Sequence, residues 1–270
     1  MFNFLHNFTP EPIAFSFGIF SIHWYGVFVV FGIIVGLLMT TKLAKHFNIS
    51  SDDVYNLAFY VIIFGLLGAR LYSVILDWSY YATNPGQIIA VWNGGLAIQG
   101  GIASGVIAAW IYLRKKNQSF WQWADLAAPA LPLGQAFGRW GNYFNQEIFG
   151  RPTNLPWGIP IEIQNRSAEF LTSEYFHPTF LYESILSLLN FIILLLVFKN
   201  KLGKWTPGQV GVLYLINYSV IRIAMELLRT DSVPKIFGLR VTMLTSVVML
   251  GLAVCLFFYL KNFKLTQSRL

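Results

Sequence analysis

The sequence predicts an all-α integral membrane protein, a bundle of seven transmembrane helices with an extracytoplasmic cap formed mainly by the 139–177 loop. Apolar residues make up 56% of the chain and charged residues only 11%, whereas a soluble domain has about 25% charged residues. The apolar residues lie in long runs, each near the roughly 20 residues that a helix needs to cross a bilayer core of about 30 Å. Residues 1–270 are therefore expected to form a single polytopic membrane domain.

Seven apolar segments account for the predicted spans. The fourth is the weakest, because it contains Asp125, Pro129 and Pro132, which the interior of a bundle accommodates better than a lipid-facing helix does. The spans are expected at about 23–41, 55–76, 94–113, 121–138, 178–198, 208–228 and 240–260.

The distribution of basic residues predicts the orientation. The first 22 residues and the 77–93 loop contain no Lys or Arg, whereas 11 of the 19 Lys and Arg residues lie on the other side. These are Lys42, Lys45, Arg114, Lys115, Lys116, Lys199, Lys201, Lys204, Lys261, Lys264 and Arg269. By the positive-inside rule, the N-terminus is outside and the C-terminus is cytoplasmic. The long 139–177 loop is then outside, and its prolines and aromatic residues favour an ordered cap.

Composition also excludes several functions. The net charge of +7 does not indicate nucleic acid, because the basic residues lie between apolar runs, where they meet anionic lipid. The single Cys255 cannot form an internal disulfide and is expected to be a small buried residue. Neither a G-x-S-x-G nor an HExxH motif occurs, and the four histidines are scattered, so no metal or cofactor is predicted. The N-terminus lacks a basic segment and a cleavage site, so no removable signal peptide is expected.

Charged residues inside the spans are the best candidates for a functional site, because a charge in the bilayer core is costly. In the sixth span, Tyr218, Arg222, Glu226 and Arg229 fall within about 80° of one another on a helix. This polar face must point into the bundle or into a wet cavity. It could bind an anionic substrate, or it could be an ion-pair ladder that only holds helices together.

A second polar group follows the fourth span. Arg139 lies where this span reaches the outer interface, and Asn142, Asn145 and Gln146 add neutral donors. With Arg222, Arg139 would suit a phosphate, because guanidinium groups bind phosphate through two parallel hydrogen bonds. The alternative is that Arg139 only anchors a helix end at the interface.

Two further features are interpreted as structural. The pairs Gly32 and Gly36, Gly101 and Gly105, and Gly134 and Gly138 have the GxxxG spacing that permits close helix packing. Arg70, in the second span, is expected to be an internal tie to Asp77 or to a carboxylate of an outer loop.

The motifs together resemble a known family. The segment Gly138-Arg139-Trp140-Gly141-Asn142, followed by Asn145-Gln146-Glu147 and Gly150-Arg151, resembles the signature of bacterial prolipoprotein diacylglyceryl transferases. The resemblance covers roughly residues 20–260. Further family landmarks occur in order: His23-Trp24-Tyr25-Gly26, Gly68-Ala69-Arg70-Leu71, Trp92-Asn93-Gly94-Gly95-Leu96 with Gly100-Gly101, His177-Pro178 with Leu181-Tyr182-Glu183, and Arg222 with Glu226 and Arg229.

This resemblance implies a reaction and its partners. The family takes the diacylglyceryl group of phosphatidylglycerol, joins it by a thioether to the lipobox cysteine of a prelipoprotein signal peptide, and releases glycerol phosphate. No cofactor or nucleic acid is implied. The expected location is the bacterial plasma (inner) membrane, with the active site toward the outer leaflet.

The resemblance also implies roles for individual residues. Arg139 and Arg222 would be catalytic, stabilising the charge that develops on the phosphate. The expected substrate-binding residues are Arg139, Tyr25, Gln99, Asn142, Glu147, Gly150, Tyr218, Glu226 and Arg229.

The proton acceptor is left open by one departure from the family pattern. Many family members have a histidine where this chain has Gln99, and an amide cannot act as a general base. Glu147 and Glu226 are the alternative bases. A third alternative is that the arginines make the substrate thiol acidic enough to need no base.

Two other classes of protein fit some of these features. A transporter or flippase for an anionic amphiphile could also use two arginines in a cavity. A non-enzymatic assembly factor could use the polar residues for helix packing alone. Formation of a thioether distinguishes the transferase from both.

Overall fold

The computed structural model describes residues 2–18, 20–201, 204–231 and 233–267. The structure is mostly helical, with 70% of residues in helices. The chain divides into two compact units: unit 1 comprises Met1–Met39 and Ala124–Leu270, and unit 2 comprises Thr40–Trp123. Arg269, one of the basic residues that predicted the orientation, lies outside the described residues.

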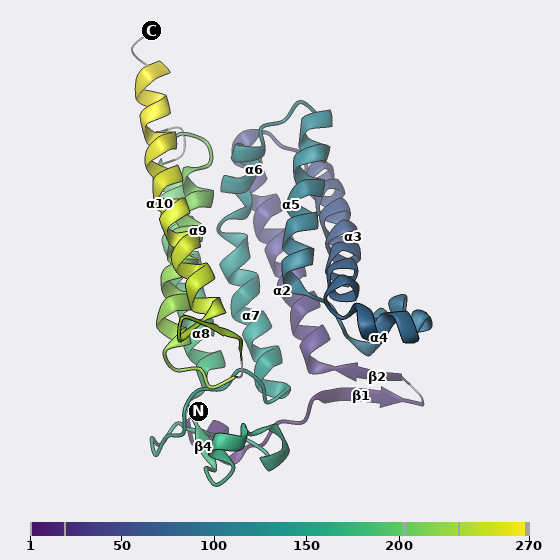
Figure 1. Cartoon of the computed structure of the whole chain (residues 1–270). Coiled ribbons are helices and arrows are strands. Elements are labelled where there is room, and N and C mark those ends of the chain that lie inside the picture. Colours follow the sequence, from purple (N-terminus) through teal and green to yellow (C-terminus); the bar gives the residue numbers. More distant parts are fainter. Residues whose placement is uncertain (1, 19, 202–203, 232, 268–270) are drawn as a thin grey trace. The chain divides into compact units, whose positions relative to one another are not determined.

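Unit 1 contains a row of packed helices. Figure 1 shows α7, α8, α9 and α10 side by side, in colours from teal to yellow, and each packs on the next along the chain. Helix α2 begins in unit 1 and ends in unit 2, and α6 crosses back. The helices are α1 (Phe2–Asn7), α2 (Trp24–Ala44), α6 (Phe120–Ala127), α7 (Ala130–Phe144), α8 (Thr179–Lys201), α9 (Gln209–Glu226) and α10 (Val241–Gln267).

Among the described residues, the connections of unit 1 contain three short antiparallel pairs of strands. The 145–178 segment, between α7 and α8, also contains the 3₁₀ helices η4 (Ile163–Asn165) and η5 (Ala168–Phe170). This segment shares an apolar core with α1, α7 and α8, which includes Leu5, Tyr143, Phe149, Phe176 and Phe180. The strand pairs are β1 (Ile13–Phe17) with β2 (Phe20–His23), β3 (Ile159–Pro160) with β4 (Tyr175–Phe176), and β5 (Lys235–Ile236) with β6 (Leu239–Arg240).

Unit 2 is built on two long helices, α3 (Ser51–Leu76) and α5 (Ile98–Lys115), which pack against each other. The side chain of Ser50 caps α3 by accepting a hydrogen bond of 3.1 Å from the amide of Asp53. Between the two helices lie α4 (Trp78–Thr83), η2 (Pro85–Ile88) and η3 (Val91–Asn93), and η1 (Lys45–Phe47) precedes α3.

Glycines allow close helix contacts at most of the predicted positions. In unit 1, a Cβ atom on Gly32 would lie 2.9 Å from the carbonyl oxygen of Gly134, so α2 and α7 approach at these two residues. In unit 2, Cβ atoms on Gly101 and Gly105 would each lie 3.4 Å from atoms of α3. The packing prediction is therefore confirmed there. It is wrong for Gly138, where no atom lies within 4 Å of the Cβ position.

Arg70 is an internal tie of unit 2, but its partners differ from the prediction. Its guanidinium donates to the carbonyl oxygens of residues 87, 88, 90, 94 and 95, and it lies 5.0 Å from the centre of the Tyr81 ring. The contacts of Arg70 in the structure are thus backbone carbonyls rather than the carboxylate of Asp77. They hold the loop that leads into α5.

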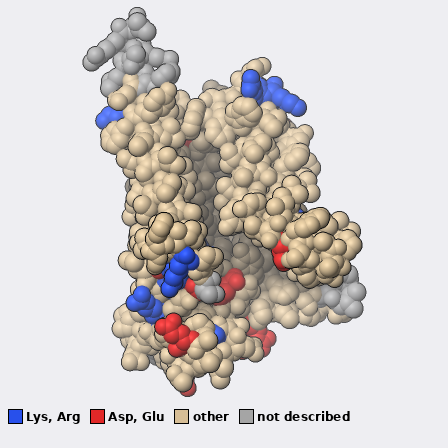
Figure 2. All heavy atoms as spheres, viewed as in Figure 1, with Lys and Arg blue, Asp and Glu red and all other residues tan. Residues whose placement is uncertain are grey.

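Four helices among the described residues are long and apolar enough to cross a membrane: Trp24–Phe47, Ser51–Leu76, Thr179–Asn200 and Val241–Asn262. Large apolar side chains on them are exposed, such as Phe59 at 62% and Leu252 at 67%. Figure 2 shows helices with largely uncharged surfaces, and charged side chains mostly near the helix ends and connections. These features indicate a membrane protein. Cys255 is also exposed on α10, so its predicted burial is wrong.

The predicted fourth span is divided into α6 and α7 at residues 128 and 129. Helix α7 also continues six residues beyond the predicted end at residue 138, as far as Phe144. The start of the predicted cap, from residue 139, is therefore helical. The apolar run ends at Arg139, but the helical hydrogen bonds continue as far as the end of α7 at Phe144.

The contacts of Asp125 explain why a charged residue is retained in the predicted fourth span. Its carboxylate accepts hydrogen bonds from the amides of Gly208 at 2.7 Å and Gly211 at 2.9 Å. These amides lie at the start of α9, where the helix leaves its first N–H groups without intrahelical partners. The residue at the N-cap, Gly208, has no side chain to supply this contact. Asp125 therefore caps α9 from another helix.

We expect Asp125→Ala to destabilise the protein by about 1–3 kcal/mol, because the buried amide of Gly208 and the partly buried amide of Gly211 lose their acceptor. The measurement is the melting temperature of the purified protein in detergent. Asp52→Ala, which removes an exposed carboxylate at the start of α3, is the matched control. Equal melting temperatures for the two variants would contradict the capping role.

Candidate active site

A buried carboxylate on α8 lies among three arginines. Glu183 is only 4% exposed. Its Oε2 lies 2.7 Å from the Nε of Arg139 on α7, and its Oε1 lies 3.8 Å from an Nη atom of Arg222 on α9. Arg229, just beyond α9, has an Nη atom 3.9 Å from the same Oε1. Three separate segments therefore bring their guanidinium groups to one carboxylate.

Two more carboxylates extend this group. Glu226, the last residue of α9, lies 3.1 Å from Arg222 and accepts hydrogen bonds from Arg240 and Thr242. Asp231 accepts two hydrogen bonds from Arg229, at 2.8 and 3.0 Å, and lies 3.1 Å from Arg240. We call these residues the arginine cluster: Arg139, Arg222, Arg229, Arg240, Glu183, Glu226 and Asp231.

The arginine cluster carries an excess of positive charge, since four guanidinium groups face three carboxylates. Burial of such charges is costly unless each one has partners. The pairing is least complete at Glu183, because its Oε1 is buried without a hydrogen bond among the residues described and lies 3.8 and 3.9 Å from its nearest guanidinium nitrogens. A net positive, incompletely paired cluster is suited to an anion.

Asn142 connects Arg139 to the chain beyond α7. Its Oδ1 accepts a hydrogen bond of 3.2 Å from Arg139, and its Nδ2 donates to Glu147 at 2.8 Å. Asn145 donates to the same carboxylate oxygen at 3.3 Å. Asn142 is buried, whereas Glu147 is exposed. Glu147 is thus coupled to the arginine cluster through one amide.

The backbone around Glu147 is unusual. Gln146 and Ile148, on either side of it, have φ angles of +50° and +57°, a left-handed conformation that side chains with a Cβ rarely adopt and that strains a β-branched residue. Gln146 donates to the carbonyl of Pro10 at 2.9 Å and accepts from the amide of Glu162 at 2.8 Å. Thr179 donates to the carbonyl of Ile148. These contacts hold the strained turn in place.

The other predicted binding residues of unit 1 lie near these elements. Tyr25, at the start of α2, packs on α7 so closely that a Cβ atom on Gly141 would lie 2.8 Å from its ring. Gly150 pairs with Arg229 in an isolated β-bridge, and its own Cβ position lies 2.7 Å from the Cβ of His177. Tyr218 lies one helical turn before Arg222, and its ring packs beside that of Tyr214.

Gln99 belongs to unit 2. It is exposed at the second residue of α5, and the loop before it is held by Arg70. Its participation in the site stays a prediction.

The structure therefore brings together Arg139, Arg222, Arg229, Glu226 and Asn142, which the sequence had selected from two distant segments. One geometric detail of the prediction is wrong: Arg229 is not on the helical face of α9, because the helix ends at Glu226. Arg229 reaches Glu183 from the turn that follows.

Three residues of the arginine cluster were not selected from the sequence as site residues: Glu183, Asp231 and Arg240. Glu183 had a signal, since it is the only charged residue between positions 178 and 198 of a predicted span. Arg240 had a weaker one, because it is a basic residue at the predicted outer end of the last span, against the positive-inside rule. Asp231 had none, since loop carboxylates are common.

His177 has a structural role beside the site. Its backbone carbonyl accepts hydrogen bonds from the amides of Gly150 and Thr179, both at 2.9 Å. Its Nδ1 lies 3.2 Å from the hydroxyl of Tyr182, which also accepts a hydrogen bond from Trp157. Burial lowers the pKa of the His177 ring, which favours its neutral form. It orders the junction between the 145–178 segment and α8.

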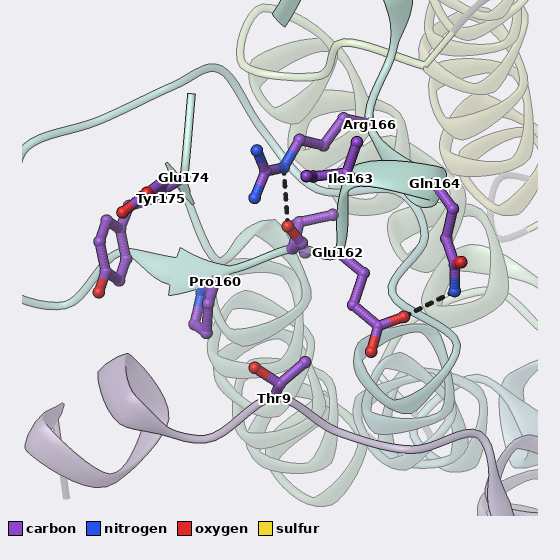
Figure 3. Close-up of a pocket in the computed structure, with 9 residues that line it drawn as sticks. Thr9, Pro160, Glu162, Ile163, Gln164, Arg166, Glu174 and Tyr175 are labelled. Atoms are coloured by element: carbon purple, nitrogen blue, oxygen red, sulfur yellow. Dashed lines mark hydrogen bonds between the residues drawn. The ribbon is translucent and has the colours of Figure 1, made fainter. Parts of the chain in front are cut away.

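A pocket of about 520 Å³ lies in the 145–178 segment and the N-terminal segment of unit 1. Figure 3 shows Gln164 donating to Glu162, and Arg166 donating to the backbone of Ile161. The pocket contains none of the arginines of the arginine cluster, so it is not the predicted phosphate site. Its lining residues are Thr9, Pro160, Ile161, Glu162, Ile163, Gln164, Arg166, Glu174 and Tyr175.

The fold and the arginine cluster define a helical membrane protein with a buried, cationic site. Comparison with known proteins then shows its family, because the family model for prolipoprotein diacylglyceryl transferase matches residues 12–259. This match and the relatives described next show that the chain belongs to the prolipoprotein diacylglyceryl transferase family.

The relatives cover almost the whole chain. The chain is 43% identical over 259 residues to the phosphatidylglycerol–prolipoprotein diacylglyceryl transferase of Nostoc sp., which covers 94% of this chain and 91% of the relative. It is also 43% identical to proteins of the same name from Finegoldia magna, over 247 residues, and Acaryochloris marina, over 246 residues. These alignments each cover 91% of this chain, and 94% and 89% of the respective relatives.

The ion pairs of Asp231 predict a dependence of stability on pH. Burial raises its pKa, but the hydrogen bonds and charge of Arg229 and the charge of Arg240 outweigh this and lower the pKa overall. Because the folded pKa is below the unfolded value of about 3.9, the stabilisation is complete above that value and is lost as the pH falls through the folded pKa.

We expect the melting temperature of the Asp231→Asn variant to fall less than that of the wild type between about pH 7 and about pH 3. Asp52→Asn, at an exposed carboxylate, is the control and should follow the wild type. The same pH dependence in wild type and Asp231→Asn would show that these ion pairs do not stabilise the fold.

Proposed function

We propose that the chain transfers the diacylglyceryl group from phosphatidylglycerol to the thiol of the lipobox cysteine of prelipoproteins, the first step of bacterial lipoprotein maturation. The product is a thioether, and glycerol phosphate is released. The observation that carries the proposal is that Arg139 and Arg222, in a chain of this family, both reach one carboxylate on α8. Two arginines that share a carboxylate can also share a phosphate.

The reaction requires one bond to form and one to break. The cysteine sulfur attacks the carbon of the diacylglyceryl group that bears the phosphate ester. The C–S bond forms, and the C–O bond between that carbon and the phosphate breaks. The electron pair of that bond leaves with glycerol phosphate, and the thiol proton passes to a base or to the leaving group. Arg139 and Arg222 would bind the phosphate and stabilise the negative charge that develops on it.

Three routes for the thiol proton are compatible with the contacts. Glu226 is engaged by Arg222, Arg240 and Thr242, which suits a fixed counter-ion better than a base. Glu147 is exposed and is linked to Arg139 through Asn142, so it is the better candidate of the two. The third route needs no base, because nearby arginines favour the thiolate.

The remaining predicted residues would bind the substrates around these two arginines. Tyr25, Asn142 and Gly150 lie on or against the elements that hold Arg139 and Arg229. Tyr218 precedes Arg222 on α9. Gln99, on α5 of unit 2, is also proposed to bind substrate. No metal or dissociable cofactor is part of the proposed reaction.

The proposed topology is a single membrane domain with seven spans, the N-terminus outside and the C-terminus cytoplasmic. Helices α5 and α9 have 18 residues each, close to the length that a bilayer needs. With the α6–α7 segment they would add three spans to the four long apolar helices. The 145–178 segment would then belong to the extracytoplasmic cap.

Several features support an active site toward the outer leaflet of the plasma membrane. Arg139 is in the last turns of α7, Glu183 is in the second turn of α8, and Glu226 ends α9. These are the helix ends that adjoin the proposed cap. The relatives with this name are bacterial, and phosphatidylglycerol and signal peptides both reach such a site from the bilayer.

We expect Arg139→Ala and Arg222→Ala each to lower transfer by about 10²-fold or more, because each removes a donor to the developing charge. The measurement is the transfer of labelled diacylglyceryl from phosphatidylglycerol to the cysteine of a lipobox peptide. Arg114→Ala, at an exposed residue of α5, is the control.

Near-normal transfer by a well-folded Arg139→Ala enzyme would exclude the phosphate role. A wild-type enzyme that moved lipid without forming the thioether would instead support the transporter alternative.

We expect Gln99→His not to raise the transfer rate, because the proposed proton routes do not use position 99. A general base contributes about 10²–10⁴-fold to a rate. An increase of even about tenfold in the same assay, relative to Gln99→Asn, would show that an imidazole at this position joins the chemistry.

A further inference from the structure

The carboxylate of Glu183 lies at unequal distances from its three arginines. Its Oε2 is 2.7 Å from Arg139, but Arg222 and Arg229 are 3.8 and 3.9 Å from Oε1. That oxygen is buried and has no hydrogen bond among the described residues. One contact of the carboxylate is therefore tight and two are loose.

The loose contacts differ from those elsewhere in the arginine cluster. Asp231 accepts two hydrogen bonds from Arg229, and Oε1 of Glu226 accepts two from Arg240 and Thr242. Oε2 of Glu226 has no hydrogen bond among the described residues, but it lies 3.1 Å from Arg222. A carboxylate that served only to tie helices together would gain most from such close contacts. Glu183 instead lies between Arg139 and Arg222 with only one of the two firmly bound.

We propose that Glu183 is a resident anion that competes with phosphate for Arg139 and Arg222 and thereby sets how tightly phosphate esters are held. It would be a positioning residue, since it acts through the two arginines and not on the reacting atoms. This inference rests on the proposed function for the identity of the phosphate ester. The competition itself requires only the contacts of the arginine cluster.

Access to the arginines supports the competition. The side chains of Arg139 and Arg222 are 21% and 13% exposed, whereas that of Glu183 is 5% exposed. The two arginine side chains thus retain some exposed surface while their carboxylate partner is covered. An incoming phosphate can therefore reach the two arginines and replace Glu183 as their anionic partner.

Competition matters most for the product. Phosphatidylglycerol is a phosphodiester with one negative charge, and glycerol phosphate is a monoester with up to two charges near neutral pH. A cluster with excess positive charge would hold the more highly charged product more tightly than the substrate. The carboxylate of Glu183 opposes this, because it lowers the gain from each added negative charge. The arginines return to Glu183 when the product leaves.

The test is to measure the binding of glycerol phosphate, by calorimetry and as an inhibitor of transfer, in wild type and Glu183→Gln. Glutamine keeps the size of the side chain and removes its charge. We expect glycerol phosphate to bind about tenfold more tightly or better, with a lower KM for phosphatidylglycerol and a lower kcat. Glu169→Gln, at an exposed loop carboxylate, should leave all three values unchanged.

A merely structural role predicts the opposite pattern. If Glu183 only orders the arginines, Glu183→Gln should weaken the binding of glycerol phosphate and raise KM, and this result would overturn the proposal. If Glu183→Gln does not fold, Glu183→Asp provides the measurement, since its shorter carboxylate is further from Arg139. Tighter glycerol phosphate binding by this variant supports competition, and unchanged or weaker binding contradicts it.

Calorimetry also separates this proposal from the proposed function, because it does not depend on turnover. Tighter binding in Glu183→Gln, with no thioether formed by the wild type, would support competition and remove the transferase assignment. Normal transfer by the wild type, without tighter binding in either variant, would leave the transferase assignment and remove the competition.

Discussion

The burial of Glu183 is the constraint on which the rest of unit 1 depends. A carboxylate at 4% exposure between apolar helices is stable only when cations surround it. Arg139, Arg222 and Arg229 supply them from α7, α9 and the turn after α9. The three guanidinium groups repel one another, so they in turn need Glu183, Glu226 and Asp231. Neither set of charges would be tolerated at this depth without the other.

This mutual dependence explains the backbone around the arginine cluster. Three arginines meet one carboxylate only if the end of α7, the start of α8 and the end of α9 lie side by side. The connections between the helices fix these positions. The strained turn at Gln146 and Ile148 is held by Pro10, Glu162 and Thr179. The bridge between Gly150 and Arg229 requires the close approach that a glycine allows. The 145–178 segment is therefore part of the support of the site, and not only a connection between two helices.

Much of the fold could be predicted, because the main signal is the length of apolar runs. Helices α2, α3, α8 and α10 contain such runs with few charged residues, and among the described residues they are the four with the character of membrane spans. The ends of helices could not be predicted this way. Arg139 ends an apolar run, yet α7 continues to Phe144, and Arg229 continues the helical spacing, yet α9 has already ended.

Three of the four arginines of the candidate site were predictable, but the carboxylate that three of them share was not. Arg139 and Arg222 were selected because a charge within a membrane span is costly and is retained mainly where it has a function or a partner. That the two share Glu183 depends on contacts between residues more than 35 positions apart, which no local pattern contains. The partners of Arg70 were missed for a different reason, since they are backbone carbonyls, which every residue has.

The comparison between Arg70 and the arginine cluster shows how structural and ligand-binding arginines differ in a protein of this kind. Arg70 donates to five carbonyls of one loop, and these neutral acceptors fill the donor positions of its guanidinium. No anion is needed there, and the charge itself serves to strengthen the hydrogen bonds. Arg139 and Arg222 have fewer contacts with their carboxylates: one of 2.7 Å for Arg139, and two of 3.1 and 3.8 Å for Arg222. Donors that remain available beside an excess of positive charge favour an exchangeable anion, and this feature sets the arginine cluster apart from Arg70.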